Sequence, residues 1–294
     1  DYCNFRALKE HFDNRSHLEW KNKSESKNAT HKRNKFTFIS TAAEKHAFTQ
    51  FIFFKQFRKL KEYANNKGIQ LIGDLPIFVA LDSADVWANS TLFDLNSEGS
   101  PNKVAGVPPD YFSEDGQLWG NPLFNWAAHK KEKFKWWTQR IKYNLDLYDC
   151  VRTDHFRGFE SCWAVPVAET TAINGQWEKA PGKELFKTIK NQIGVMPIIA
   201  EDLGVITPEV EALLEETGFP GMAVLHFAFG GDASNPYLPH NLKRNQVVYS
   251  GTHDNDTSLG WFDSLHPSSQ EHVKKYLGIS GENIGWDLFR ASIA

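Results

Sequence analysis

Helix and strand patterns alternate strictly along most of this chain, and this alternation restricts its fold more than any other feature. Between residues 41 and 67, apolar residues recur mostly at intervals of three and four, which predicts a long amphipathic helix. The apolar stretch at residues 69–79 then predicts a buried strand ending in a loop. The order continues with predicted helices at 131–145, 183–193, 207–217, 268–277 and 286–293 and strands at 149–155, 196–201, 222–227 and 246–252. Such alternation is typical of parallel strands joined by crossover helices.

Two segments interrupt the alternation. Residues 1–40 carry a short helix pattern at 5–12 and a polar, charged stretch at 21–35, so we expect a solvated helical insertion ahead of an α/β body at 41–294. Residues 82–126 show little periodicity and are rich in Gly, Pro, Asn and Ser. Loops of this length inside a compact domain are usually functional, so we expect a long active-site loop here.

Charge and hydropathy exclude two classes of partner. The formal net charge is -3 and charges of both signs are interspersed, so the sequence offers no basic face of the kind that follows a phosphate backbone. No apolar run approaches the roughly 18 to 20 residues that a membrane span needs. We therefore expect neither nucleic acid nor membrane as a partner.

The cysteines and the chain start suggest where the protein works and what is missing. Cys3, Cys150 and Cys162 are odd in number and lack metal-ligand spacing, so we expect reduced thiols in a cytoplasmic protein. The chain opens on Asp1 and its two methionines are Met196 and Met222, from which we expect a fragment or a processed chain.

Acidic residues follow four of the five predicted strands. They are Asp74, Asp154, Glu201 and Asp254. In a barrel of parallel strands the carboxyl ends open on one face, where the active site lies, so we expect these carboxylates to converge.

Converging carboxylates beside arginine and histidine suit glycoside chemistry. One acid must protonate the leaving oxygen, which requires a raised pKa, while another must stay ionised near the oxocarbenium-like carbon. Arg152, two residues before Asp154 on a strand, projects from the same face and would keep Asp154 ionised. Like charges on neighbouring strands would favour the protonated form of Glu201.

Other polar residues near these acids have structural interpretations. Asp202 and Asp256 each lie beside a better placed acid, and we interpret them as loop caps or hydrogen-bond acceptors. His226 lies inside an apolar strand, where a satisfied core histidine is the first interpretation, but its place near the strand end leaves a site role open.

Tryptophan is abundant, with 10 residues. Flat rings stack on sugar faces, and four tryptophans lie in or next to the presumed catalytic loops: Trp87, Trp119, Trp126 and Trp163. Four others fall in or beside predicted helices and are expected to pack internally: Trp20, Trp136, Trp137 and Trp286.

Six ordered motifs then make a family recognisable. They are GDLPIFV at 73–79, GVPPDYF at 106–112, GNP at 120–122, RTDHFRG at 152–158, AEDLG at 200–204 and GTHDNDT at 251–257. These motifs resemble those of the 4-alpha-glucanotransferases, also called amylomaltases or disproportionating enzymes, of glycoside hydrolase family 77. The resemblance covers nearly the whole chain.

The resemblance implies a (β/α)8 barrel with helical insertions that transfers an α-1,4-glucan segment to the 4-hydroxyl of an acceptor sugar, without metal or organic cofactor. It implies Asp154 as nucleophile, Glu201 as acid/base and Asp254 as transition-state stabiliser. The substrate-binding residues that it implies are Asp74, Tyr111, Phe112, Trp119, Asn121, Arg152, His155 and His253. Tyr111, Phe112 and Trp119 would belong to a flap that favours a sugar acceptor over water.

The resemblance also sets expectations for context. Its substrates are maltooligosaccharides and starch- or glycogen-type glucans, and its location is the cytoplasm, or the plastid in a plant. The implied barrel has eight strands and the chain supplies about five, so we expect a fragment that lacks both ends of the barrel.

Three alternatives remain beside transfer. An α-glucan hydrolase of the amylase type shares the three carboxylates, and product analysis separates the two activities. A glucan-binding fragment without turnover would bind maltooligosaccharides and leave them intact. A metal-dependent barrel hydrolase could use the same acids and histidines, although the sequence lacks a His-x-His or His-Glu-x-x-His pair.

Overall fold

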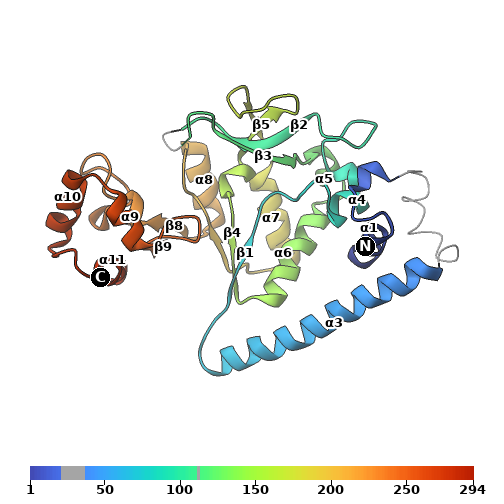
Figure 1. Cartoon of the computed structure of the whole chain (residues 1–294), viewed down its shortest axis with the longest axis horizontal. Coiled ribbons are helices and arrows are strands. Elements are labelled where there is room, and N and C mark those ends of the chain that lie inside the picture. Colours follow the sequence, from blue (N-terminus) through green and yellow to red (C-terminus); the bar gives the residue numbers. More distant parts are fainter. Residues whose placement is uncertain (21–36, 111–112) are drawn as a thin grey trace. The chain divides into compact units, whose positions relative to one another are not determined.

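The computed structural model describes residues 1–20, 37–110 and 113–294, with side chains described from residue 41 in the second of these ranges (Figure 1). The described residues form two compact units, Asp1–Pro197 and Ile198–Ala294. The expected insertion at 21–35 and the candidate residues Tyr111 and Phe112 lie outside the described residues. We describe each unit by itself.

Unit 1 contains the longest helix, two parallel strands and an antiparallel sheet. Its elements in chain order are α1 (Tyr2–His11), η1 (His17–Glu19), α3 (Thr37–Asn66), β1 (Ile72–Leu75), α4 (Ala84–Ala88), η2 (Ser90–Leu92), β2 (Lys103–Val107), β3 (Gln117–Pro122), α5 (Trp126–Lys131), α6 (Lys135–Leu147), β4 (Cys150–Thr153), η3 (Phe156–Phe159), β5 (Ser161–Pro166), β6 (Gln176–Lys179) and α7 (Gly182–Ile193).

Unit 2 contains the last three of the predicted strands. Its elements are β7 (Ile198–Ala200), α8 (Pro208–Thr217), β8 (Gly221–Val224), η4 (Leu225–Phe227), η5 (Pro239–Asn241), β9 (Gln246–Tyr249), α9 (Ser258–Ser264), α10 (Pro267–Leu277) and α11 (Ile284–Ile293). Its core cluster comprises Leu225, Ala228, Phe229, Leu238, Phe262, Val273, Ile284 and Leu288.

The predicted alternation of helices and strands is confirmed. All five predicted strands form, and β1 with β4 and β8 with β9 pair in parallel. The strands are shorter than predicted because side chains and prolines end the ladders. Before β1, the carboxylate of Asp149 accepts the Leu71 N–H at 2.8 Å, and after it Pro76 has no N–H to donate. Helix α6 packs on both β1 and β4 (Figure 1).

The segment at 82–126, expected to be one long loop, contains ordered strands and short helices, so that expectation is wrong in part. Strands β2 and β3 lie within it, and they form an antiparallel sheet with β5 and β6 in the order β3-β2-β5-β6. Gly106 permits the close pairing, since a Cβ there would lie 2.4 Å from the Gln117 carbonyl oxygen. These short strands form because they pair with other strands of the sheet, and the hydrophobic periodicity of the segment does not reveal such pairing.

Residues 1–20 share a core with later parts of unit 1. Phe5 and Trp20 pack with Trp87 of α4, and all three rings are buried. The internal packing expected of Trp20 is confirmed, whereas Trp87 is a core residue and not an exposed sugar platform. Helix α3 also crosses residue 40 without a break, so the structure has no element boundary at that position.

The central core of unit 1 is aromatic and lies between α6, α7 and η3. Its fully buried side chains include Trp137, Phe134, Phe156, Phe159 and Leu185. The expected packing of Trp136 and Trp137 is thereby confirmed, whereas Trp286 of unit 2 is 64% exposed and the same expectation is wrong for it.

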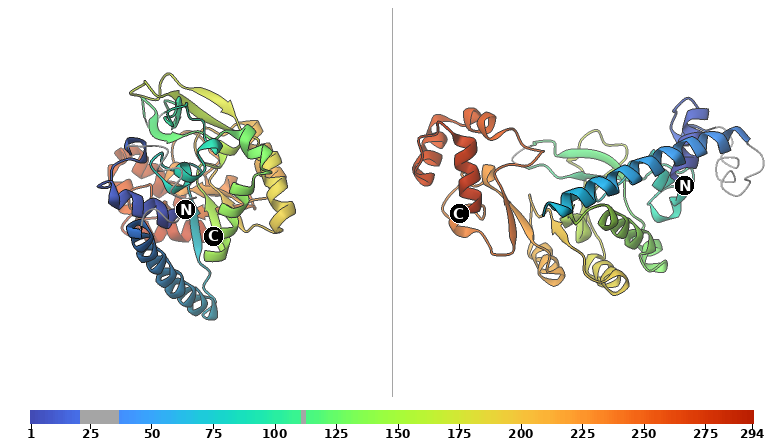
Figure 2. Two further views of the ribbon diagram at one scale, coloured as in Figure 1. Left: turned by 90° about the vertical axis from the view of Figure 1, so that its right-hand side faces the viewer. Right: turned by 90° about the horizontal axis from the view of Figure 1, so that it is seen from below.

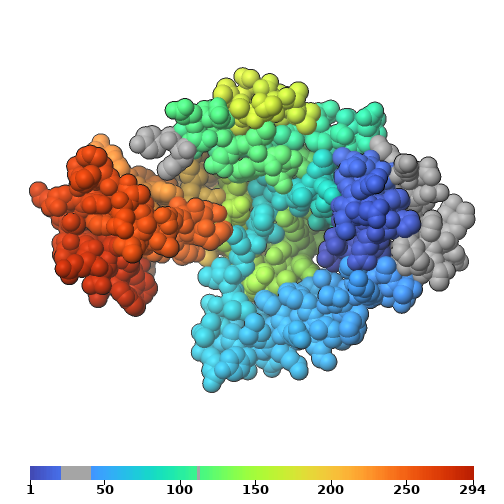
Figure 3. All heavy atoms as spheres, viewed as in Figure 1, coloured from blue at the N-terminus to red at the C-terminus, as the bar shows by residue number. Residues whose placement is uncertain are grey.

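Helix α3 forms as one continuous helix, visible from two directions (Figure 2), but many of its apolar residues are exposed. Phe48, Phe51 and Tyr63 are each more than 60% exposed, and Leu60 is 56% exposed. Much of the helix is uncovered in the space-filling view (Figure 3). The predicted helix is therefore confirmed, but the face formed by its apolar residues is only partly buried.

Two expectations from composition can be compared with the structure. All three cysteines are free; Cys162 is buried, and burial raises the pKa of its thiol to about 12. Across residues 1–20, 37–110 and 113–294, no helix combines the length and apolar character needed to cross a membrane.

The buried imidazole of His129 should make unit 1 sensitive to acid. The ring is fully buried against Phe124, Trp126 and Trp136, and burial lowers its pKa from 6.5 to about 4. The neutral form is favoured in the folded state, so the stabilisation is complete above pH 6.5 and is lost as the pH falls from 6.5 to about 4. The expected loss is roughly 3 kcal/mol.

Urea unfolding of wild type and His129→Phe at several pH values between 7 and 4 measures this contribution. The free energy of unfolding should fall more steeply with acidification in wild type than in the variant. Parallel pH dependences of the two proteins would contradict the assignment to His129.

Candidate active site

In unit 1, the ends of β1 and β4 bring an arginine between two carboxylates. Asp74 and Arg152 are partners in the parallel register. Arg152 Nε donates to Asp74 Oδ1 at 3.1 Å, and its Nη1 and Nη2 donate to Asp154 Oδ1 at 3.3 and 3.0 Å. The guanidinium is buried, whereas the Asp74 and Asp154 side chains are 43% and 40% exposed. The predicted proximity of Arg152 and Asp154 is confirmed, and both carboxylates remain accessible to a ligand.

The backbone beside Asp154 is held in an uncommon conformation. Asp154 N–H donates to the Leu75 carbonyl at 3.0 Å, which continues the β1–β4 pairing. His155 then has φ +53°, a left-handed conformation that non-glycine residues seldom adopt. Such strain concentrates at functional sites, where the surrounding structure maintains it. Gly158 allows this turn, since a Cβ there would lie 2.7 Å from Ile77 Cδ1 and 3.1 Å from His155 Cδ2.

Two other candidates of unit 1 lie on β3. The Trp119 ring, 37% exposed, meets the His155 ring edge to face at 4.8 Å. Burial, reinforced by the charge of Arg157, lowers the pKa of His155 to about 3, so this imidazole is neutral at neutral pH. Asn121 Nδ2 donates to the Val79 carbonyl at 3.0 Å. Asn121 therefore ties the antiparallel sheet to the loop after β1.

Arg140 of α6 supports the loop after β1 and was missed by the sequence analysis. Its Nη1 and Nη2 donate to the carbonyls of Ile77 and Pro76 at 3.0 and 2.7 Å. The guanidinium also lies over the rings of Trp136 and Trp137, 5.1 and 5.2 Å from their centroids. An arginine in a charged helix carries no sequence signal for this role, because its partners are backbone atoms.

In unit 2, two adjacent acids follow β7. Glu201 Oε1 accepts the Leu203 N–H at 2.9 Å. Asp202 Oδ1 accepts the Met222 N–H of β8 at 2.6 Å, as its interpretation as a hydrogen-bonded loop residue predicted. Burial raises the pKa of Asp202, although the Met222 bond opposes that rise.

The Asp254 loop is held by its neighbours. Strand β9 ends at Tyr249, so Asp254 lies in a turn in which Thr252 N–H and Oγ1 bond to Asn255 Oδ1 at 2.9 and 3.0 Å. His253 Nε2 lies 3.5 Å from Asp254 Oδ1, and both side chains are about two-thirds exposed. Asp256 accepts the Thr257 N–H, in agreement with its structural interpretation.

His226 packs beneath the start of this loop. Its ring stacks on Trp261 at 4.6 Å with an angle of 3° between the planes, and its Nε2 lies 3.2 Å from Ser258 Oγ. A Cβ on Gly251 would lie 2.5 Å from His226 Cε1. The core interpretation is supported, although Nδ1 has no partner within the described part of the chain.

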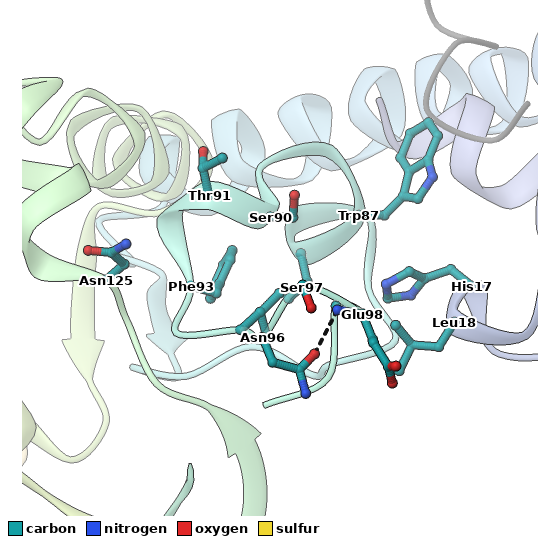
Figure 4. A pocket seen from close by; sticks show the side chains of 13 residues that line it. His17, Leu18, Trp87, Ser90, Thr91, Phe93, Asn96, Ser97, Glu98 and Asn125 are labelled. Carbon is teal, nitrogen blue, oxygen red and sulfur yellow. Dashed lines mark hydrogen bonds between the residues drawn. The ribbon is translucent and has the colours of Figure 1, made fainter. Parts of the chain in front are cut away.

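A further pocket of unit 1 lies outside these groups (Figure 4). It encloses about 330 Å³ and is lined from η1, α4 and the loop after η2. Asn96 Oδ1 accepts the Glu98 N–H at 2.9 Å on its wall. The wall includes Trp87, one of the four tryptophans considered for sugar stacking, but none of the predicted catalytic or substrate-binding residues. Over the residues that the structure describes, no group of three or more His, Cys, Asp and Glu side chains could hold a metal ion.

Comparison with known proteins identifies close relatives. The family model described as 4-alpha-glucanotransferase matches residues 1–294. A 4-alpha-glucanotransferase of Synechocystis is 55% identical over 256 residues, which cover 86% of this chain and 51% of the relative. The chloroplastic/amyloplastic 4-alpha-glucanotransferase of Arabidopsis thaliana is 53% identical over 246 residues, covering 83% of this chain and 43% of the relative.

A solved structure gives the same result. The amylomaltase of Streptococcus agalactiae, in complex with acarbose, is 43% identical with a TM-score of 0.93, and the match covers 99% of this chain and 59% of that chain. The chain thus spans about half the length of the curated relatives named above.

Proposed function

Because the chain belongs to the 4-alpha-glucanotransferase family, glycoside hydrolase family 77, we propose that the full-length protein transfers α-1,4-glucan segments between maltooligosaccharides or starch- or glycogen-type glucans. The observation that carries the proposal is the buried Arg152 between two accessible carboxylates, Asp74 and Asp154, at the ends of parallel strands. Such a cation holds a carboxylate ionised and oriented, as a nucleophile requires.

The first half of the proposed reaction cleaves the donor. An Asp154 carboxylate oxygen attacks C1 of the donor glucose and forms a glycosyl ester, while the bond from C1 to the departing O4 breaks. Glu201 gives its proton to that O4, and the shortened glucan leaves. Asp254 and His253 bind ring hydroxyls of the sugar as it flattens, and Asp74 orients the same sugar.

The second half restores the enzyme. Glu201, now ionised, takes the proton from the 4-hydroxyl of an acceptor sugar, whose oxygen attacks C1 as the ester bond to Asp154 breaks. The two displacements retain the anomeric configuration, and this mechanism requires the two carboxyl groups to stand about 5 to 5.5 Å apart. No metal or organic cofactor takes part.

Several residues would favour a sugar over water as the acceptor. Trp119 and His155 meet edge to face, and their exposed surface suits the apolar face of a glucose ring. Tyr111, Phe112 and Asn121 are proposed neighbours of the bound glucan. Exclusion of water then makes transfer faster than hydrolysis.

The finer fold and the location are part of the same proposal. The strands β1, β4, β7, β8 and β9 alternate with helices, and β1–β4 and β8–β9 pair in parallel, which suits part of a (β/α)8 barrel with helical insertions; the rest of the barrel would come from the longer protein. We propose a cytoplasmic enzyme, or a plastid enzyme if the source is a plant, the latter supported by the name of the Arabidopsis relative.

Incubation of the full-length protein with maltotriose in the presence of EDTA tests the proposal. We expect free glucose together with maltooligosaccharides longer than maltotriose, because the glucose end of a donor leaves and the segment bound to Asp154 is passed to another sugar. Glucose and maltose without longer products would mean hydrolysis, and binding without any product would mean a glucan-binding protein. Loss of activity in EDTA would point to a metal-dependent enzyme.

A further inference from the structure

The loop that carries Glu201 is tied to strand β8 by its neighbour Asp202. Asp202 Oδ1 accepts the Met222 N–H at 2.6 Å, a short bond that favours the carboxylate form. Gly221 leaves room for this approach, since a Cβ there would lie 2.4 Å from Asp202 Oδ2. Glu201 itself is turned back on the loop by its bond from Leu203 N–H. The two adjacent carboxylates are thus both held by backbone donors in one tight turn.

Asp202 and Glu201 also share an electrostatic neighbour, Tyr237. It lines a cavity of about 610 Å³ with Glu211 and Glu215 of α8 and with Tyr237 and Lys243. Among these groups, Lys243 attracts and Glu211 repels its negative charge. Burial, with the charges of Asp202 and Glu201, raises the pKa of the Tyr237 hydroxyl to about 12. Tyr237 therefore stays neutral and lies within reach of both charges.

We propose that Asp202 is a positioning residue for Glu201: its bond to Met222 fixes the loop that carries Glu201, and its charge favours the protonated form of Glu201. This inference rests on the proposed role of Glu201 as the acid/base. An acid that donates a proton at neutral pH must keep that proton; the Leu203 N–H bond favours the ionised form of Glu201, and the neighbouring negative charge of Asp202 acts against that loss.

Two substitutions in the full-length protein separate charge from geometry. Asp202→Asn keeps an oxygen that can accept the Met222 N–H but removes the charge. We expect the basic limb of its kcat profile with maltotriose to move to lower pH by about one unit, with KM nearly unchanged. Asp202→Ala removes the bond as well, and we expect kcat to fall on the order of 100-fold through misplacement of Glu201.

Glu215→Gln is the matched control, because it removes one negative charge from the same cavity wall on α8. Its basic limb should coincide with that of wild type. An unmoved basic limb in Asp202→Asn would overturn the inference, even if the variant unfolded at a lower temperature, since a purely structural tie would change stability alone. If Asp202→Ala does not fold, Asp202→Asn still decides the question.

Failure of the proposed function would look different. Glu201→Gln should lose nearly all transfer of unactivated maltotriose. Full activity in Glu201→Gln, or no transfer by wild type, would refute the proposed function itself. Transfer by wild type, loss in Glu201→Gln and an unmoved limb in Asp202→Asn would refute the positioning role alone.

Discussion

Substituting Asp154 by Asn in the full-length protein should lower the rate of maltotriose disproportionation by on the order of 10⁴-fold or more. The amide is nearly isosteric but cannot attack C1, and it loses the charge that Arg152 binds at 3.0 Å. Arg152 keeps its bond to Asp74, so the fold of the β1–β4 pair should survive. The measurement is the initial rate of glucose release, with circular dichroism to verify folding.

Asp146→Asn, an exposed aspartate near the end of α6, provides the matched control and should retain the wild-type rate. A stronger test uses Asp154→Ala with α-glucosyl fluoride and azide, which should yield β-glucosyl azide because azide enters through the space that the carboxylate vacates. Undiminished disproportionation by Asp154→Asn would mean that the nucleophile lies elsewhere.

Replacing Arg152 by Met should lower kcat/KM on the order of 10² to 10³-fold, because removing the buried cation leaves two neighbouring carboxylates without their charge partner. Asp74 and Asp154 would then face each other without a cation. Arg152→Lys should be intermediate, since one ammonium cannot reproduce the three bonds of the guanidinium fork. The measurement is kcat/KM for maltotriose in the full-length protein.

Arg58→Met, on the exposed side of α3, controls for loss of a positive charge and should leave kcat/KM unchanged. Equal activity of Arg152→Met and Arg58→Met would show that the guanidinium does not organise the carboxylates. If Arg152→Met does not fold, the activity of Arg152→Lys, which retains the charge, still tests the role of the guanidinium.

The candidate residues of unit 1 could be located from sequence because strand ends have a simple geometry. Carboxyl ends of neighbouring parallel strands lie side by side, so an acid after each strand is enough to predict that Asp74 and Asp154 approach one another. Arg152 could be placed beside Asp154 because residues two positions apart on a strand project from the same face. The contacts of Arg152 with both carboxylates confirm this reasoning.

Other parts depend on partners that sequence patterns do not reveal. Strands β2 and β3 lie in a segment that looks like a loop, because their short runs are stabilised by pairing with each other and with β5. Trp87 looked like a loop tryptophan, but it packs in a core with Phe5 and Trp20, both far away in the sequence. Arg140 bonds to backbone carbonyls, which every residue possesses, so no residue type marks its partners.

Sequence alone determined the order of the five strands β1, β4, β7, β8 and β9 and of the main helices between them, and the places of the acids along the chain, because periodicity and turn chemistry are local properties. Tertiary structure alone decided the antiparallel sheet, the support from Arg140 and the bond of Asp202 to Met222. These features depend on distances between atoms that are remote in sequence, which only the packed chain defines. The residue types of the candidate site could therefore be predicted from the sequence, whereas the contacts that hold these residues in place depend on the fold.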